Sequence, residues 1–244
     1  MTENEKAEFF NDPQRWNRYI YAIDNPLKYT DPLGLYVCDT NALNKTQCQQ
    51  IQKGLENNRD HGNKEQKRVA NWLLDKKNKT VITLDNNDSN ARVNNSNGAN
   101  ALIQRGNATV NEASEFLTIA IKPGNFNSDE ALEGTLVHEG RHSWVQANII
   151  TSFSNGDSVS EDITRYRDEL LARDTGVKYL RDRGGKYATF AVNLGQLKSD
   201  KITVNEQSIR QQIATDYKDP NGQPLTDKNQ GVKVSAMFGL IPHK

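Results

Sequence analysis

The segment LVHEGRHSW, residues 136–144, constrains the fold of this chain more than any other part of the sequence. Ser128 or Asp129 can cap a helix that runs through it. Successive residues of an α-helix are rotated by about 100°, so side chains four positions apart lie on one face. His138 and His142 are therefore expected to lie one above the other, close enough for both imidazoles to reach one ion.

Glu139 follows the first of these histidines and completes a His-Glu-x-x-His sequence. Its carboxylate is placed to hold a water molecule beside the ion and to take its proton. Zinc suits this pattern because it accepts imidazole nitrogen and tolerates an open fourth position. A helix with two structural histidines is the alternative interpretation. The apolar neighbours Leu136, Val137 and Trp144, together with a predicted strand at 116–121, favour the catalytic one.

A third protein ligand is expected, and the chain contains four histidines in all. The two others, His61 and His243, lie in a polar early segment and next to the end of the chain. A carboxylate on the next predicted helix is therefore the simplest choice. Glu169 is our candidate, because it lies in mid-helix beside apolar residues, where an unpartnered carboxylate would be costly to bury.

Other assignments remain open. Three more acidic residues of the same predicted helix are candidate ligands: Glu161, Asp162 and Asp168. Glu169 itself could instead be a surface acid paired with Arg165 or Arg173 at helical spacing. A further donor is expected to stabilise the negative charge that develops on the substrate. Four residues are candidates for it: Tyr166, Arg165, Tyr179 and Tyr187.

This motif, followed by a helix with a Glu, resembles the gluzincin branch of zinc metallopeptidases. The resemblance implies zinc bound by His138, His142 and Glu169, with Glu139 as the catalytic base. It also implies an α+β, zincin-like fold with a small sheet. In such a fold the strand at 116–121 would lie at the sheet edge, above the site helix, and would pair with an extended substrate.

The remaining pattern of apolar, β-branched and turn-forming residues predicts an ordinary mixed domain. Helices are expected at 41–57, 63–77, about 158–183 with a capping box of Ser158 and Glu161, and 205–217; strands at 80–84, 187–194 and 232–238; loops at 86–100 and 218–227. Cys38 and Cys48 are too few for a disulfide scaffold or a four-thiolate zinc site. We expect free thiols, with pairing in an oxidising compartment as the alternative.

Residues 11–35 differ from the rest, because their prolines forbid a long helix and favour short extended pieces. A linker or an arm packed on the next domain is one interpretation. The segment WNRYIYAIDNP and the residues after it, however, resemble the end of the core domain of Rhs (YD-repeat) proteins. The signature Pro-x4-Asp-Pro-x-Gly-Leu is formed here by Pro26, Asp31, Pro32, Gly34 and Leu35.

In Rhs proteins the core forms a shell around a variable C-terminal toxin, and the chain cleaves itself just after this signature through aspartates. The resemblance implies that residues 1–35 are the end of an Rhs core and that residues 36–244 are the toxin domain. Asp31 would be the proximal aspartate. Asp12 would be a second one, although it lacks the Gly of the family's upstream pattern.

The two resemblances together imply a secreted effector of the polymorphic-toxin type, a zinc metalloendopeptidase that hydrolyses peptide bonds in a target cell. They also imply a role in interbacterial competition or against a host cell. Expected partners are a protein or peptide substrate, a cognate immunity protein, the Rhs core shell, and secretion machinery such as the type VI system. Alternatives are a toxin of another class, such as a nuclease or another hydrolase, with an incidental motif, and a non-enzymatic module with structural zinc or no metal.

Charge and hydropathy bear on partners and location. The 31 Lys and Arg residues balance the 31 Asp and Glu residues, which argues against nucleic acid as the main partner. The N-terminal residues lack the basic and apolar regions of a signal peptide, and no apolar run is long enough to span a bilayer. We therefore expect the protein to be cytoplasmic before delivery, without membrane contact.

Overall fold

The computed structural model describes residues 29–30, 36–85, 92–95, 106–157, 162–199 and 201–240. For 29–30 and 92–95 only the backbone is described. In chain order, the elements are β1 (Tyr29–Thr30), β2 (Val37–Asp39), α2 (Lys45–His61), α3 (Lys64–Leu73), β3 (Val81–Leu84), β4 (Arg92–Asn95), α5 (Val110–Ser114), β5 (Leu117–Ile121), the 3₁₀ helix η3 (Pro123–Asn127), α6 (Asp129–Asn155), α7 (Arg165–Arg183), α8 (Gly185–Asn193), β6 (Leu197–Lys198), β7 (Thr203–Val204), α9 (Glu206–Asp216) and α10 (Val234–Met237). Several helices and a small sheet make this a mixed fold, which agrees with the expected α+β class.

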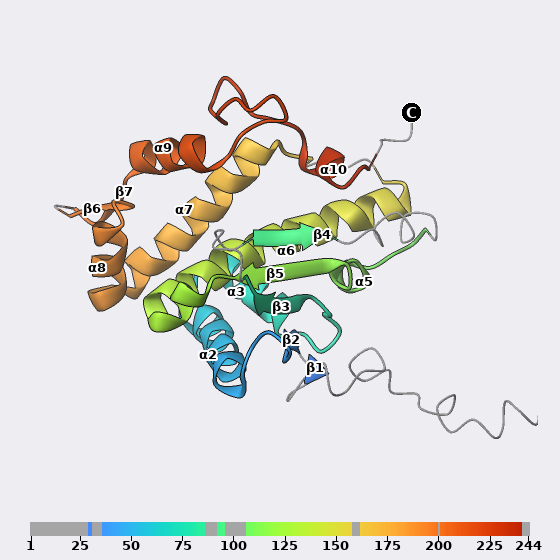
Figure 1. The fold of residues 1–244 in the computed structure, drawn as a ribbon, viewed down its shortest axis with the longest axis horizontal. Coiled ribbons are helices and arrows are strands. Elements are labelled where there is room, and N and C mark those ends of the chain that lie inside the picture. The colour runs from blue at the N-terminus through green and yellow to red at the C-terminus, as the bar shows by residue number, and fades with distance from the viewer. Residues whose placement is uncertain are drawn as a thin grey trace, which may run out of the picture.

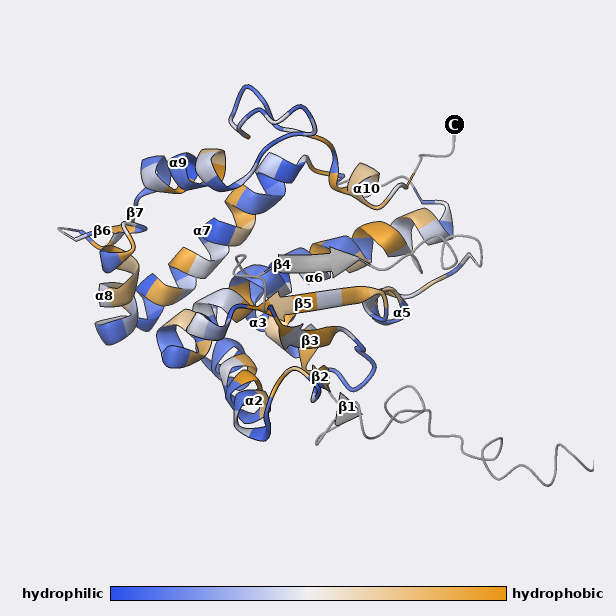
Figure 2. Ribbon diagram, in the orientation of Figure 1, coloured by the Kyte–Doolittle hydropathy of each residue, from blue (hydrophilic) through white to orange (hydrophobic). Residues whose placement is uncertain are grey.

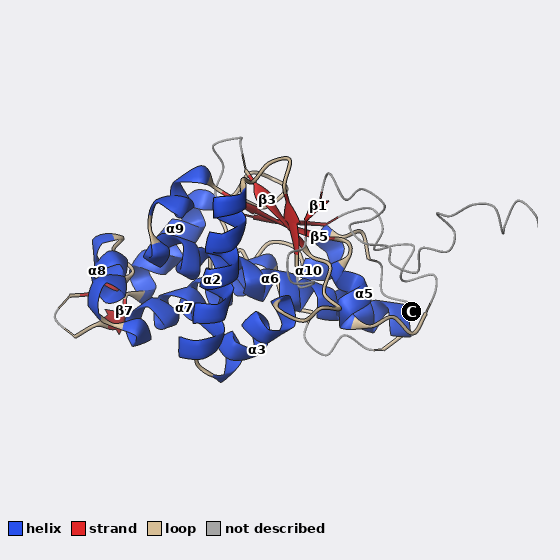
Figure 3. Ribbon diagram, turned by 90° about the horizontal axis from the view of Figure 1, so that it is seen from below, coloured by secondary structure: helices blue, strands red, loops and turns tan. Residues whose placement is uncertain are grey.

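The larger sheet has the strand order β1-β2-β3-β5-β4 (Figure 1). Its three central strands, β2, β3 and β5, run parallel, and β1 and β4 are antiparallel to their neighbours. Ile82 of β3 lies opposite Ile119 of β5, and both are fully buried. β-branched residues favour such strands because they pack well on a pleated surface. Figure 3 shows the strands of this sheet together on one side of the helices, whereas β7, of the smaller sheet β6–β7, lies beside α8.

Helix α6 lies at the centre of the fold and contacts α2, α3, β5 and α7. Two glycines allow the helices to approach one another closely. A Cβ on Gly54 of α2 would lie 2.7 Å from Leu136 Cδ1, and one on Gly140 of α6 would lie 2.8 Å from Leu73 Cδ1. Figure 2 shows apolar residues on β5 and along parts of α6. The apolar core on this side of α6 therefore fixes the rotation of the helix that carries the histidines.

The opposite side of α6 is covered by α7, with α8 and α9 packed beyond it (Figure 1). Gly134 of α6 lies against Leu180 of α7, and His138 lies against Gly176, so the two helices run antiparallel. Thr164 caps the start of α7 by accepting a hydrogen bond from the backbone N–H of Arg167. This arrangement brings the first turns of α7 next to the middle of α6.

The structure corrects four expectations about secondary structure. The helix predicted from about 158 begins at Arg165, and its proposed capping box of Ser158 and Glu161 lies outside the described residues. Residues 187–193 lie in helix α8 instead of a strand, with Leu194 as its C-cap, and 232–238 contain the short helix α10. Strand β5 is not at the edge of the sheet, because β4 pairs with it from within the expected loop 86–100.

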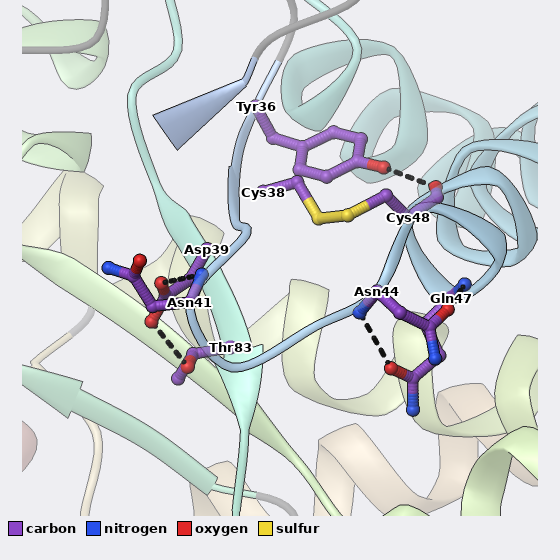
Figure 4. The surroundings of a disulfide bond; sticks show 8 residues. All are labelled: Tyr36, Cys38, Asp39, Asn41, Asn44, Gln47, Cys48 and Thr83. Atoms are coloured by element: carbon purple, nitrogen blue, oxygen red, sulfur yellow. Dashed lines mark hydrogen bonds between the residues drawn. A yellow bond between two sulfur atoms is a disulfide. The ribbon is translucent and has the colours of Figure 1, made fainter. Parts of the chain in front are cut away.

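Cys38 of β2 and Cys48 in the first turn of α2 form a disulfide (Figure 4). The hydroxyl of Tyr36 donates a hydrogen bond to the Cys48 carbonyl at 3.1 Å. The expectation of free thiols is therefore wrong. The chain reverses between β2 and α2, so that the Cα atoms of the two cysteines lie 6.1 Å apart and both side chains are buried.

The proposed self-cleavage residues lie outside the described part of the chain: Asp12, Pro26, Asp31, Pro32, Gly34 and Leu35. Within the expected Rhs segment, β1 is described, and its backbone pairs with β2 beyond the expected boundary at residue 35. Among the described residues, no helix is both long and apolar enough to cross a membrane.

Candidate metal centre

Two helices supply the candidate site. His138, Glu139 and His142 lie on α6, and each offers a ligand atom within 4.8 Å of the others. Asp168 and Glu169 lie in the first two turns of α7, directly beside them. All the residues that the sequence assigned to a catalytic zinc site therefore lie together.

Three atoms form a compact triangle at this place. The Nε2 atoms of His138 and His142 lie 3.2 Å apart. Oε2 of Glu169 lies 3.3 Å from Nε2 of His142 and 3.8 Å from Nε2 of His138. A tetrahedral zinc ion with bonds of about 2.0 to 2.1 Å separates its ligand atoms by about 3.3 to 3.4 Å. The donor types and their spacing therefore fit zinc.

The hydrogen bonds of the Glu169 carboxylate are incomplete: Tyr217 hydrogen-bonds with it, but its Oε2 atom has no hydrogen bond within the described chain. The residue is 8% exposed, and its Oε2 atom is buried without a hydrogen bond to any described residue. Its expected alternative partners are engaged elsewhere, since Arg173 pairs with Asp216 at 2.7 Å and Arg165 donates to the Lys218 carbonyl. A buried carboxylate with one unsatisfied oxygen is costly, and a cation offsets that cost.

Asp168 holds His142 in place and is not in the triangle. Its Oδ2 atom lies 2.6 Å from Nδ1 of His142, and its Oδ1 atom accepts a hydrogen bond from Arg141 at 3.0 Å. With Nδ1 bonded to a carboxylate, Nε2 is left free for a metal. Arg141 also contacts Glu65 of α3, so the support extends to a third helix.

Two other candidate ligands, Asp162 and His61, lie outside the triangle. Asp162 accepts hydrogen bonds from the backbone and hydroxyl of Ser235. His61 lies at the end of α2, where its Nδ1 atom contacts the Asn57 carbonyl. Glu161 and His243 lie outside the described residues.

Burial and charge shift the pKa values at the centre. Burial raises the pKa of Glu139 to about 8, and the nearby Glu169 and Asp168 carboxylates also raise it. Burial, followed by the charge of His142, lowers the pKa of His138 well below its usual value. For His142, burial acts to lower the pKa, but the Asp168 and Glu169 carboxylates outweigh it and raise the pKa well above normal. The pKa values of Glu139 and His142 are therefore raised and that of His138 is lowered in the same buried site.

A cleft of about 430 Å³ opens onto His138 and Glu139. Its walls come from α6, α7, α8 and the end of α9. Glu139 is 3% exposed, and its Oε1 atom lies 3.7 Å from Nε2 of His138. A substrate in this cleft would therefore reach the histidine pair and the glutamate together.

Tyr217, just after α9, also lines the cleft, and the sequence did not indicate it. The guanidinium groups of Arg165 and Arg173 lie 5.3 and 5.7 Å from the centre of its ring. Burial, then the charge of Glu169 and a hydrogen bond with it, raise the pKa of Tyr217. The phenol therefore keeps its proton and can donate a hydrogen bond beside the triangle of His138, His142 and Glu169.

The four donors named from the sequence do not line this cleft. Tyr166 hydrogen-bonds to Asp227 and Arg210, and Tyr179 and Tyr187 both donate to Glu133. Tyr217 lies 48 positions beyond Glu169 in the sequence, so the only available signal was its place at the end of a predicted helix.

Comparison of the chain with protein-family models, curated proteins and solved structures gave no match.

Proposed function

We propose that the protein is a zinc-dependent peptidase in which His138, His142 and Glu169 bind the metal. The observation that carries this proposal is the triangle of two imidazole nitrogens and one buried carboxylate oxygen, 3.2 to 3.8 Å apart. Structural zinc sites normally have four protein ligands. Three ligands and an adjacent Glu139, open to a cleft, instead match a catalytic site.

Bound zinc would act as a Lewis acid on the scissile carbonyl and lower the pKa of a water molecule. The positive charge of a nearby cation would favour the carboxylate form of Glu139 over the protonated one. As a carboxylate, Glu139 takes a proton from the attacking water, whose oxygen bonds to the carbonyl carbon. As the carbon–nitrogen bond breaks, Glu139 delivers that proton to the leaving amine. The phenol of Tyr217 donates a hydrogen bond to the oxygen on which negative charge develops. Asp168 keeps the His142 ring oriented throughout.

The sheet supports a zincin-like arrangement. β4 is the outermost of the described strands on its side, and it contacts α6. An antiparallel edge strand can pair with an extended peptide through backbone hydrogen bonds. We therefore assign to β4 the substrate-pairing role that the sequence suggested for the strand now seen as β5.

Metal analysis of the full chain together with peptide cleavage tests this proposal. The wild type should contain one zinc ion per chain and cleave peptides. Glu169→Gln should lose zinc, whereas Glu206→Gln, a matched change of an exposed glutamate on α9, should keep it. Glu139→Gln should keep zinc and lose about 10²- to 10⁴-fold in rate. Full zinc content in Glu169→Gln, or undiminished cleavage by Glu139→Gln, would show the assignment to be wrong.

We further propose that the peptidase is a toxin released from an Rhs-type carrier and neutralised by an immunity protein. The signature that ends at Leu35 supports this proposal, and the Cys38–Cys48 disulfide favours action in an oxidising compartment. Mass spectrometry of a carrier fusion should find a fragment that begins at Tyr36. Expression with export to the periplasm should inhibit growth, and Glu139→Gln should abolish the effect. An intact chain, or equal toxicity of the variant, would contradict this role.

A further inference from the structure

The cleft at the metal centre continues from His138 and Glu139 toward the start of α6. On α6 it is lined by Ala131, Gly134 and Thr135, which share a face with His138 because of their helical spacing. Opposite them, four residues of α7 line the same cleft: Arg173, Gly176, Val177 and Leu180. Because the two helices run antiparallel and touch at Gly134 and Leu180, this part of the cleft forms a channel along the line where they meet, and it leads away from the catalytic residues.

The charged side chains of this channel are already paired. Arg173 is bonded to Asp216 at 2.7 Å, and Glu130 is bonded to Lys186 at 2.8 Å. Gln212, another lining residue, accepts a hydrogen bond from Arg173. A charged side chain of a substrate would therefore have to break an existing ion pair in order to gain a partner here.

The other wall of the channel is apolar. Val177 and Leu180 of α7 are nearly buried, and Phe190 of α8 is half-buried. Leu194 follows α8 and is 45% exposed, which makes it one of the few exposed large apolar residues in the described chain. Gly195, at φ 71°, turns the chain directly after it. Leu194 thus remains in solvent at the rim of an apolar wall, where contact with another apolar group would remove it from water.

We infer, on the basis of the proposed peptidase activity, that this wall is the subsite for a large aliphatic or aromatic side chain next to the scissile bond. The occupant is a substrate side chain because the channel is continuous with the cleft that holds His138 and Glu139. Phe190 and Leu194 determine the specificity, and the paired charges exclude acidic and basic side chains. The substrate class is therefore protein segments that carry an exposed or unfolded apolar residue.

Digestion of a proteome-derived peptide library by the zinc-loaded full chain tests this inference. Cleavage should be concentrated at bonds next to Leu, Ile, Met, Phe or Tyr. Leu194→Asp should lower kcat/KM at those bonds by about 10-fold or more, within the range that apolar pocket contacts contribute. Met237→Asp, at a residue of similar exposure outside the cleft, is the matched control and should leave the profile unchanged. Zinc content should be the same in all three proteins.

The outcomes separate this inference from the proposed function. Cleavage that requires Glu139 but shows no preference for apolar residues would overturn the subsite and leave the peptidase intact. A preference for Asp, Glu, Lys or Arg, or an unchanged profile in Leu194→Asp, would overturn it as well. If the zinc-loaded wild type cleaved no peptide, both the subsite and the proposed peptidase function would be overturned.

Discussion

Two buried glutamates at the α6–α7 interface differ in how their charge is satisfied. Glu133 of α6 is 1% exposed and accepts hydrogen bonds from Tyr179, Tyr187 and Asn57. Glu169 of α7 is similarly buried, yet one of its oxygens has no hydrogen bond within the described chain. The same pair of helices thus contains one carboxylate with three hydrogen-bond donors and one with an oxygen left free for the zinc ion that we propose. This contrast distinguishes a structural network from a ligand site.

Of the changes proposed here, removal of zinc should have the largest effect, because it acts on Glu169 and leaves Glu133 unaffected. A ligand that binds only the folded state stabilises it by about 4 kcal/mol at a thousand times its dissociation constant. We therefore expect a chelator to abolish cleavage and to lower the melting temperature of the wild type. In Glu169→Gln the chelator should change the melting temperature little. Equal chelator effects in both proteins would place the metal elsewhere.

Exchange of each glutamate for Gln should produce opposite patterns. Glu133→Gln removes charge-assisted hydrogen bonds from two tyrosines, so we expect it to destabilise the protein by about 3 kcal/mol, while zinc still binds. Glu169→Gln should cost less in the zinc-free protein, because Oε2 accepts no hydrogen bond there. Urea unfolding with and without zinc measures the free energy of unfolding of both variants. If the zinc-free Glu169→Gln variant lost more stability than Glu133→Gln, our interpretation of the two sites would be reversed.

Two tyrosines beside these carboxylates allow the next comparison. Tyr187→Phe removes a hydroxyl that lies 2.9 Å from Glu133, and should cost about 1.5 to 3 kcal/mol of stability without changing kcat. Tyr217→Phe should lower kcat by about 100-fold and leave zinc content unchanged. Steady-state kinetics and thermal unfolding of both variants check this. A kcat unchanged in Tyr217→Phe would exclude the phenol as the donor to the oxyanion.

The sequence predicted the parts of the site that depend on local spacing. His138, Glu139 and His142 share one helix, so their relative positions follow from helical geometry. Glu169 was also found, because an acid among apolar residues of a helix needs a partner. Tyr217 was missed, since only the packing of α9 against α7 brings it to the cleft.

The errors in the fold have similar causes. Residues 187–194 resembled a strand by composition, but Tyr187, Ala188 and Ala191 are buried at helical spacing in α8. Strand β4, the outermost of the described strands on its side, lies in an Asn-rich stretch whose residues are typical of loops, and pairing with β5 defines it. The disulfide depends on a chain reversal that two isolated cysteines do not reveal.

The smallest effect is expected from a change at Asp168. This carboxylate differs from both Glu133 and Glu169. It is buried like the other two, but it is satisfied by a histidine of the metal triangle and by Arg141. Asp168→Asn keeps the shape and can still contact the ring, yet it no longer favours a proton on Nδ1 as strongly. Zinc affinity should therefore fall about 10- to 100-fold, as is usual when the partner of a ligating histidine is changed.

Competition with a chromogenic zinc chelator measures this affinity, and Asp174→Asn, at an aspartate of α7 outside the cleft, is the matched control. The control should bind zinc as the wild type does. If Asp168→Asn also did so, His142 would be oriented by the helix packing alone, and Asp168 would belong with Glu133 as a structural group. If zinc binding were lost entirely, as in Glu169→Gln, Asp168 would itself be a ligand, and the triangle of His138, His142 and Glu169 would be incomplete.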